Sequence, residues 1–199
     1  EASLGYFISP LFSMLLGRLF FNEHFNRIQL VAIVLAAIGI FWLALPAGQV
    51  PWVALLLTLT FGLYGLLRKT APLDALPGLA LETLLLLPFA LAYLGWLAQQ
   101  GQLVFVSLPP LLLATLIGSG IVTTVPLLLF AAGARRISMS DLGIIQYVSP
   151  TIQFLLGLFL FGEAFDVSRF IGYGWVWLGV AVYLFGIWHQ QRSKRMPVE

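Results

Sequence analysis

Seven apolar runs dominate the sequence, and each is long enough to cross a lipid bilayer in helical form. Only 9% of the residues are charged and 60% are hydrophobic, so the chain cannot cover a water-facing surface. Runs such as residues 28–45 lack the alternation of a barrel strand, which favours helices. The sequence predicts an all-α integral membrane protein with helices near residues 4–21, 29–47, 51–68, 77–98, 110–134, 141–161 and 169–189.

Several other classes of protein are disfavoured by what the sequence lacks. The chain has no cysteine, which excludes disulfides and thiolate metal sites. His24 and His189 sit beside polar or charged residues near predicted helix ends, and no HExxH, GxSxG or P-loop pattern occurs. The net charge is +2, but the basic residues are scattered between apolar runs and do not indicate a nucleic-acid partner. We expect no enzyme activity, no cofactor and no metal.

The basic residues predict the direction of the chain in the membrane. Loops on the cytoplasmic side carry an excess of Lys and Arg. If the C-terminus is cytoplasmic, only Arg169 falls on the opposite side. Residues 190–199 would then form a basic cytoplasmic tail. The residues that gather on the predicted cytoplasmic side are Arg27, Arg68, Lys69, Arg135, Arg136, Arg192, Lys194 and Arg195.

A stretch of the chain is duplicated, because residues 9–25 return 140 positions later as residues 149–165. Eight positions are identical in the two copies. They include a Ser-Pro dipeptide, a Gly and a Glu, which have the same spacing in both copies. The two copies are five predicted crossings apart, and an odd number of crossings inverts the second copy in the membrane. Inverted repeats are typical of secondary transporters, which build the substrate site between them.

The repeat predicts a domain organisation. If the unit has five helices, residues 1–47 are the last two helices of one unit and residues 51–189 are the whole of the next. We therefore expect seven helices of a ten-helix, 5+5 transporter bundle. The other three helices would precede Glu1, and they are an expected partner of this chain.

Glu82 is the acidic residue that most requires an explanation. It lies inside the predicted helix 77–98, where a charge costs roughly 2.5 to 3.5 kcal/mol at the bilayer centre. One reading is a proton carrier that titrates as the pathway alternates. The other reading is a shallow ion pair with Arg68 or Lys69, and both remain open.

The predicted helix 141–161 has a polar side that suggests a substrate pathway. Gln146 and Pro150 share one face, and Tyr147 and Thr151 lie on the adjoining stripe. Pro150 cannot donate a backbone hydrogen bond and should free the carbonyl near residue 146. Thr124, with Ser119 and Thr123 of the helix 110–134, would lie opposite. Hydrogen bonding between helices is the alternative role for these side chains.

Small and acidic residues near the helix ends indicate packing and capping. Glu23 and Glu163 follow the two repeated helices, and we expect capping or loop ion pairs with Arg27 and Arg169. Ser138 and Asp141 have the spacing of a capping box before the helix 141–161. Close helix contact is predicted for two stripes, one of Gly5, Ser9, Ser13 and Gly17 and one of Gly172, Gly179 and Gly186.

Several short motifs are distributed over nearly the whole chain. They are Leu4–Pro10 with Leu15–Gly17 and Glu23, Tyr64–Lys69, Leu81–Thr83 with Pro88, Thr124–Phe130 and Leu142–Thr151.

These motifs resemble the RarD-type branch of the EamA drug/metabolite transporters. The resemblance implies a multi-pass permease or exporter of small metabolites or drugs in the bacterial inner membrane. We expect it to be proton-coupled and to alternate access between two repeats. Tyr64 and Arg68 of the Tyr64–Lys69 motif join the expected pathway. A flippase for lipid-linked substrates, a membrane subunit of a larger complex and a homodimer remain open alternatives.

Overall fold

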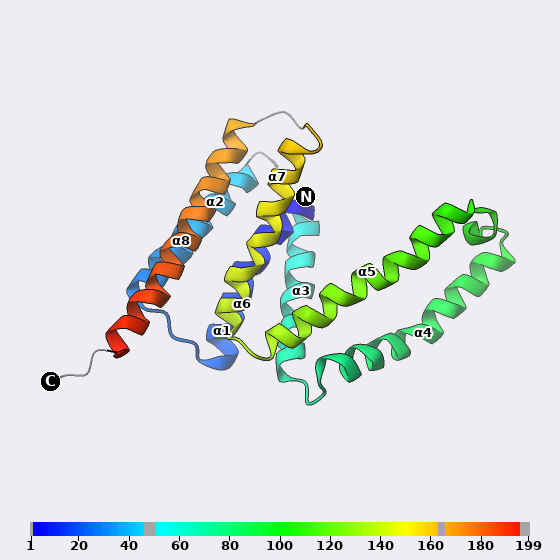
Figure 1. Ribbon diagram of the computed structural model, residues 1–199, viewed down its shortest axis with the longest axis horizontal. Coiled ribbons are helices and arrows are strands. Elements are labelled where there is room, and N and C mark those ends of the chain that lie inside the picture. The colour runs from blue at the N-terminus through cyan, green and yellow to red at the C-terminus, as the bar shows by residue number, and fades with distance from the viewer. Residues whose placement is uncertain (1, 46–50, 163–165, 196–199) are drawn as a thin grey trace. The chain divides into compact units, whose positions relative to one another are not determined.

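A computed structural model describes residues 2–45, 51–162 and 166–195 of the chain (Figure 1). Throughout these residues the regular elements are helices. The first four are α1 (Ala2–Phe21), α2 (Arg27–Ala44), α3 (Trp52–Thr70) and α4 (Ala75–Gln99). They are followed by the 3₁₀ helix η2 (Val104–Ser107), α5 (Pro110–Ala134), α6 (Met139–Gln146), α7 (Val148–Phe159) and α8 (Val167–Arg195).

The described helices have the length and composition of a membrane protein. Six helical stretches are long and apolar enough to cross a membrane, and Gly5–Phe21 of α1 is a shorter apolar helix. The all-α class predicted from the sequence is therefore confirmed. The number of seven crossings and the ten-helix 5+5 arrangement remain predictions.

One predicted helix is interrupted. The helix expected at residues 141–161 is divided into α6 and α7, which meet at Tyr147. A proline ring clashes with the carbonyl four residues earlier, and residue 146 stands four positions before Pro150. The interruption falls at that position, so Pro150 ends α6 as well as removing a donor.

The chain divides into two compact units, which are described separately below. Unit 1 comprises Glu1–Leu66 and Ile137–Glu199, and unit 2 comprises Leu67–Arg136. This division does not follow the predicted repeat boundary between residues 47 and 51, which remains a prediction.

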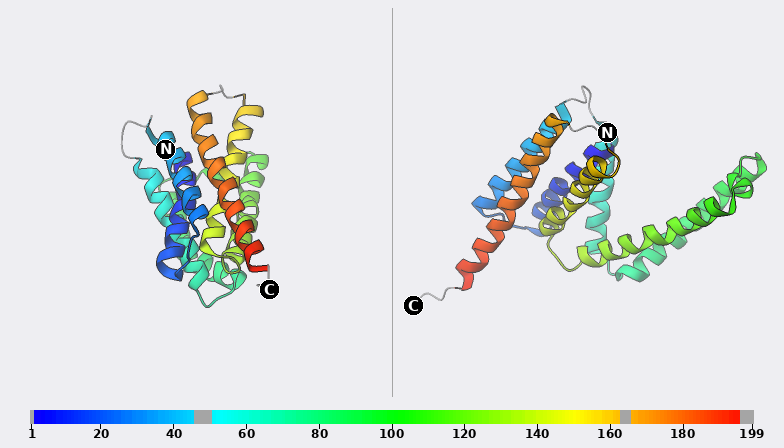
Figure 2. Two further views of the ribbon diagram at one scale, coloured as in Figure 1. Left: turned by 90° about the vertical axis from the view of Figure 1, so that its left-hand side faces the viewer. Right: turned by 45° about the horizontal axis from the view of Figure 1, so that its top comes forward.

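The helix pair α2 and α8 is the most extensive contact in unit 1 (Figures 1 and 2). The Asn26 side-chain amide donates to the Gly186 carbonyl at 3.2 Å, and the Trp42 indole donates to the Ser168 carbonyl at 3.0 Å. The start of α2 therefore lies beside the end of α8, and the two helices are antiparallel. A Cβ added at Gly179 would lie 2.8 Å from the Ala32 carbonyl oxygen. The prediction of close packing by the α8 glycines is confirmed.

The contacts between α2 and α8 are related by the 140-residue offset of the repeat. A Cβ on Gly39 would lie 2.6 Å from the Gly172 carbonyl oxygen, and Gly179 approaches Ala32 in the same way. Adding 140 to Ala32 gives Gly172, and adding 140 to Gly39 gives Gly179. Each contact is thus the counterpart of the other, as in an interface around a two-fold axis.

Helix α1 carries its predicted stripe of small residues into the interior of unit 1. Ser9 and Ser13 are buried, and the Ser9 hydroxyl donates to the Gly5 carbonyl at 2.8 Å. A Cβ on Gly5 would lie 3.1 Å from the Ala54 carbonyl oxygen of α3. At the other end, a Cβ on Gly17 would lie 3.0 Å from the Met139 Cβ of α6. The stripe therefore serves helix packing, as predicted.

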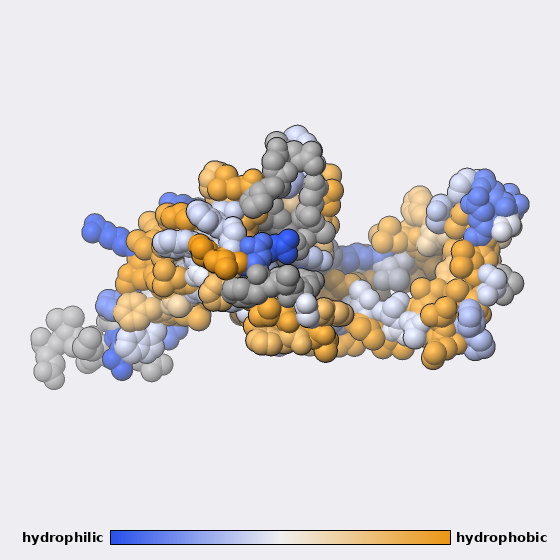
Figure 3. Space-filling model, turned by 90° about the horizontal axis from the view of Figure 1, so that it is seen from above, coloured by the Kyte–Doolittle hydropathy of each residue, from blue (hydrophilic) through white to orange (hydrophobic). Residues whose placement is uncertain are grey.

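Unit 2 is a hairpin of α4 and α5 that follows the last residues of α3. Almost none of the apolar residues in these two helices is buried within the described structure. Orange, apolar residues cover most of the hairpin surface that is visible in Figure 3. Such a surface is stable only against lipid or against further protein.

Candidate functional site

Arg68 and Glu82 form an ion pair at the base of the hairpin in unit 2. The Arg68 Nη2 atom donates to the Glu82 Oε2 atom at 3.0 Å. The Arg68 side chain is 4% exposed and that of Glu82 is 45% exposed, so a buried cation meets a half-exposed anion. Gly78 of α4 makes room, because a Cβ there would collide with the Arg68 guanidinium. The ion-pair reading of Glu82 therefore has the predicted partner, and the proton-carrier reading remains untested.

Arg135 and Lys69 hold the ends of this hairpin together. Arg135 donates to the carbonyls of Ala71, at 3.0 Å, and Leu73, and it pairs with Asp74 at 3.5 Å. Lys69 donates to the Ala134 carbonyl at 3.2 Å. From the sequence, Arg135 and Lys69 were predicted to lie on the cytoplasmic side, and Lys69 was also an alternative partner of Glu82. The carbonyls that Arg135 contacts lie in the loop after α3, so its place at the C-terminus of α5 does not predict these contacts.

The hydroxyl groups of α5 donate to carbonyls of their own helix. The Thr124 hydroxyl donates to the Gly120 carbonyl at 2.7 Å, and that of Thr123 donates to Ser119 at 2.7 Å. The Ser119 hydroxyl donates to the Leu116 carbonyl at 2.6 Å. All three side chains lie on exposed parts of α5, and such back-bonding is common where no other acceptor is near.

The break between α6 and α7 is held by hydrogen bonds to Tyr147 and Thr151. The Tyr147 carbonyl accepts from the Thr151 backbone N–H at 3.3 Å and from the Thr151 hydroxyl at 2.8 Å. The Thr151 hydroxyl in turn accepts from the Trp177 indole of α8 at 3.0 Å. Pro150, which lies between Tyr147 and Thr151 in the sequence, is buried. Gln146 is half-buried at the end of α6.

The side chain of Tyr147 points into the core of unit 1. It is 2% exposed and belongs to a cluster that includes Met14, Ala36 and Val176. Its hydroxyl is buried and has no hydrogen-bond partner among the described residues. A buried hydroxyl is normally paired, so this one requires a physical or functional reason.

The predicted pathway residues fall into two groups. Glu82, Arg68 and Thr124 belong to unit 2. Unit 1 holds the others, which are Tyr64, half-buried in α3, with Gln146, Tyr147, Pro150 and Thr151. Within these groups the structure joins Arg68 to Glu82 and Tyr147 to Thr151 by hydrogen bonds. Their membership of one pathway remains a prediction.

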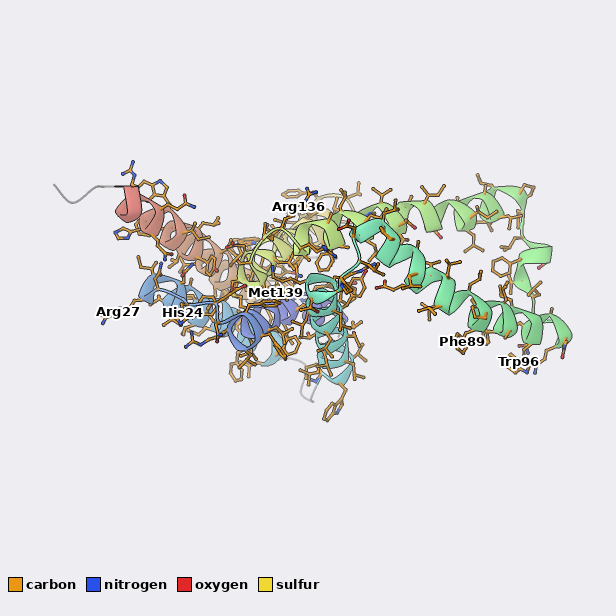
Figure 4. All side chains as sticks on the ribbon, turned by 90° about the horizontal axis from the view of Figure 1, so that it is seen from below. His24, Arg27, Phe89, Trp96, Arg136 and Met139 are labelled. Carbon is orange, nitrogen blue, oxygen red and sulfur yellow. The ribbon has the colours of Figure 1, made fainter. Side chains whose placement is uncertain are left out.

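Glu23 caps a helix that is distant in sequence. Its carboxylate accepts from the backbone N–H groups of Met139, at 2.7 Å, and Ser140, at 3.0 Å, and also from the Ser140 hydroxyl. Ser138 caps the same helix, because its hydroxyl accepts from the Asp141 N–H at 2.9 Å. Capping was expected for Glu23, but the capped helix was not identified from the sequence. Figure 4 labels His24 and Met139 at this end of unit 1.

A polar pocket of about 320 Å³ lies at the same end of unit 1. Glu23 is half-buried in its wall. Of the described residues, no three His, Asp or Glu side chains are grouped as metal ligands would be. The lining residues beside Glu23 include His24, Ser138, Asp141, Tyr183 and Gln190.

The contact expected between Glu163 and Arg169 lies partly outside the described residues. Arg169 pairs with Asp166 at 3.5 Å, and Glu163 lies outside the described residues.

The helices and their apolar surfaces define a multi-pass membrane protein, and comparison with known proteins defines its family. The model of the EamA-like transporter family matches residues 50–185, which is well over half of the chain. The chain therefore belongs to the EamA-like transporter family and is of the RarD type.

Relatives with similar sequences support this assignment. An uncharacterized transporter of Pseudomonas aeruginosa is 44% identical over 99% of this chain and 66% of its own length. Protein RarD of Escherichia coli is 40% identical over 98% of this chain and 66% of its own length. An uncharacterized transporter of Bacillus subtilis is 44% identical over 93% of this chain and 61% of its own length. The chain thus spans a little under two thirds of these relatives. No solved structure matches it.

Proposed function

We propose that this protein is a secondary-active carrier for small metabolites or drugs, and that a proton gradient drives it. Membership of a transporter family supports this proposal, and so do the names of the relatives. The proposed location is the bacterial inner membrane, with the C-terminus in the cytoplasm. Lipid and three further helices of the same protein would cover the exposed apolar faces of the α4–α5 hairpin.

Alternating access between two inverted repeats is part of the proposal. It is supported by two contacts, that of Gly39 with Gly172 and that of Ala32 with Gly179. The 140-residue offset of the repeat relates Ala32 to Gly172 and Gly39 to Gly179, so each contact is the counterpart of the other. Inversion across the membrane requires equivalent helices to run in opposite directions, and α2 and α8 are antiparallel. A carrier built this way alternates by moving one repeat against the other.

The observation that carries the proposed proton coupling is the Arg68–Glu82 pair. The pair places a titratable carboxylate against a buried guanidinium that cannot lose its own proton. Protonation of Glu82 would remove a negative charge from beside the buried Arg68 guanidinium, and a buried cation is disfavoured where its charge is less well compensated. The two protonation states of Glu82 would therefore favour different arrangements of the hairpin, which is the coupling that a proton-driven carrier needs.

The proposal is tested with Glu82→Gln in the full-length protein, because glutamine keeps the size of the side chain and removes its titratable charge. The measured quantities are accumulation of a transported compound under an imposed proton gradient and exchange of that compound without a gradient. We expect Glu82→Gln to abolish accumulation and to retain exchange, because exchange does not require the carrier to return empty and deprotonated.

Asp74→Asn is the matched control, since it removes a carboxylate from the same hairpin. Asp74 pairs with Arg135 at the surface, where an ion pair contributes about 0 to 1 kcal/mol. We expect this variant to accumulate normally. Normal accumulation by Glu82→Gln would refute the proposed role of Glu82. Inactivity of the wild type under a gradient alone would instead favour a subunit that depends on a separate ATPase, or a flippase.

A further inference from the structure

The cap on α6 comes from the loop after α1 and is shaped by a glycine. Asn22 has a φ of 51°, in the left-handed region, so the chain turns back after α1. The Glu23 N–H then donates to the Gly17 carbonyl at 3.2 Å. A Cβ on Gly17 would lie 2.5 Å from the Glu23 Oε2 atom, so only glycine leaves the carboxylate in this place.

The three donors that converge on Glu23 belong to the first residues of α6. Met139 and Ser140 are buried, and their backbone N–H groups have no earlier carbonyl within their own helix. A carboxylate at this position accepts charge-assisted hydrogen bonds and also faces the positive end of the helix dipole. These bonds join residue 23 to residues 139 and 140, so they fix α6 to the end of α1.

Helix α6 is short, and its far end is Tyr147. It extends over only eight residues from Met139 to Gln146, and Tyr147 forms its C-cap. A helix of this length moves as one piece, so the Glu23 contact also determines the position of Gln146 and Tyr147. Glu23 is half-buried in the wall of the polar pocket, where water can replace the α6 donors if α6 withdraws.

We propose that Glu23 is a positioning residue that holds α6, and through it the pathway residues Gln146 and Tyr147, in one of two positions. The α6 helix is fixed while the three bonds to Glu23 are made, and it is released when they are exchanged for water. This inference rests on the proposed transport function, because that function is what makes Gln146 and Tyr147 pathway residues. The sequence repeat carries the same Gly-to-Glu spacing at Gly157 and Glu163.

The experiment uses the full-length protein in membranes with any cysteine outside this chain replaced by serine, and two single-cysteine reporters within this chain, which has no cysteine of its own. Ile144→Cys places a thiol in α6 and Ile40→Cys places one in α2. Ile144 is 8% exposed and Ile40 is 7% exposed, so the two reporters are matched in burial. The labelling rate of each thiol by a water-soluble maleimide is measured with and without Glu23→Gln.

We expect Glu23→Gln to raise the labelling rate at residue 144 by about tenfold, because an amide cannot accept from all three donors. The rate at residue 40 should stay unchanged, because α2 is held by α8. Ser140→Ala removes one donor and should give a smaller increase at residue 144. His24→Gln changes a pocket residue that makes none of the three bonds, and it should change neither rate.

Two results would overturn the inference. An unchanged rate at residue 144 would mean that Glu23 does not hold α6. Equal increases at residues 144 and 40 would mean that the variant loosens unit 1 as a whole. If Glu23→Gln does not assemble in membranes, Ser140→Ala decides between the same outcomes. The labelling rate does not depend on transport, so loss of the proposed coupling at Glu82 would leave this test intact.

Discussion

The buried hydroxyl of Tyr147 has no hydrogen-bond partner among the described residues, which lowers the stability of the fold. The packing of the ring does not need this hydroxyl. A buried donor without a partner destabilises a fold by about 1 to 3 kcal/mol. Phenylalanine would fill the same space beside Met14 and Val176 without that cost. Retention of the hydroxyl is understandable if it binds a substrate group or a proton-carrying water during part of a cycle.

Tyr147→Phe should therefore leave the protein as stable as the wild type or stabilise it by about 1 kcal/mol, while lowering transport. The measurements are thermal unfolding of the purified protein and transport in membranes. Tyr183→Phe is the matched control, because Tyr183 is equally buried but lines the polar pocket together with Ser140 and Asp141. That variant should lose about 0.5 to 1.5 kcal/mol. Full transport by Tyr147→Phe would remove the hydroxyl from the proposed pathway.

At the scale of single residues, the sequence predicted a polar contact better when the two partners lie close together in the chain. Arg68 or Lys69 was predicted as the partner of Glu82 because only a short loop separates their helices, and the structure pairs Glu82 with Arg68. Glu23 was recognised as a capping residue from its place after a helix, but its partners are more than a hundred residues away. Sequence spacing reports neighbours on one helix, and contacts between distant helices depend on tertiary packing.

Among the helices, the α2–α8 pair makes the clearest stability prediction. Gly179→Ala places a methyl group against the backbone of Ala32 and Ala36, at 2.8 and 3.0 Å from their nearest atoms. Overpacking of this kind costs about 1 to 3 kcal/mol. Thermal unfolding should show the loss.

Gly174→Ala in the same helix is the control for this prediction. A Cβ at Gly174 meets nothing within 4 Å, and alanine is a better helix former than glycine by roughly 0.5 to 1 kcal/mol. This variant should be as stable as the wild type or slightly more stable. Equal losses in both variants would contradict the close contact between α2 and α8.

How well each helix was predicted depends on its end signals. Helix α5 was predicted with both ends correct, because Pro110 can begin a helix and the charged Arg135 follows its apolar run. The division of α6 from α7 was missed because the run from 141 to 161 is long enough to be one helix and a proline is tolerated in many membrane helices. The effect of Pro150 on residue 146 was foreseen, but its strength depends on packing that the sequence does not show.

At the scale of the whole molecule, the distribution of basic residues predicts the orientation. Helix α4 has 25 residues and is about 37 Å long at 1.5 Å per residue, which exceeds the hydrocarbon thickness of a bilayer. The loop at Pro72 and the loop at Gln102 should therefore lie on opposite sides of the membrane. Cysteine at position 72 should react only from the cytoplasmic side, and cysteine at position 102 only from outside. Labelling of position 72 in intact cells by an impermeant reagent would reverse the proposed orientation.

The overall class followed from composition, since a chain this apolar has few alternatives to a helical bundle in lipid. The assembly of the helices did not follow, because the 3.6-residue period indicates helices without showing which ones meet. Only the duplicated stretch carried information at this scale, because it relates residues 9–25 to residues 149–165 by a fixed offset of 140.

The back-bonded hydroxyls of α5 also bear on the kind of solute that we expect this helix to attract. Thr123, Thr124 and Ser119 each commit their single proton to a carbonyl of α5. What remains available on each oxygen is a lone pair, so this part of the helix offers acceptors and no free donors. An ammonium or amide group could bind there without disturbing the helix. A carboxylate or phosphate would first have to draw a proton away from the backbone, so we expect these hydroxyls to favour solutes that donate hydrogen bonds over anions.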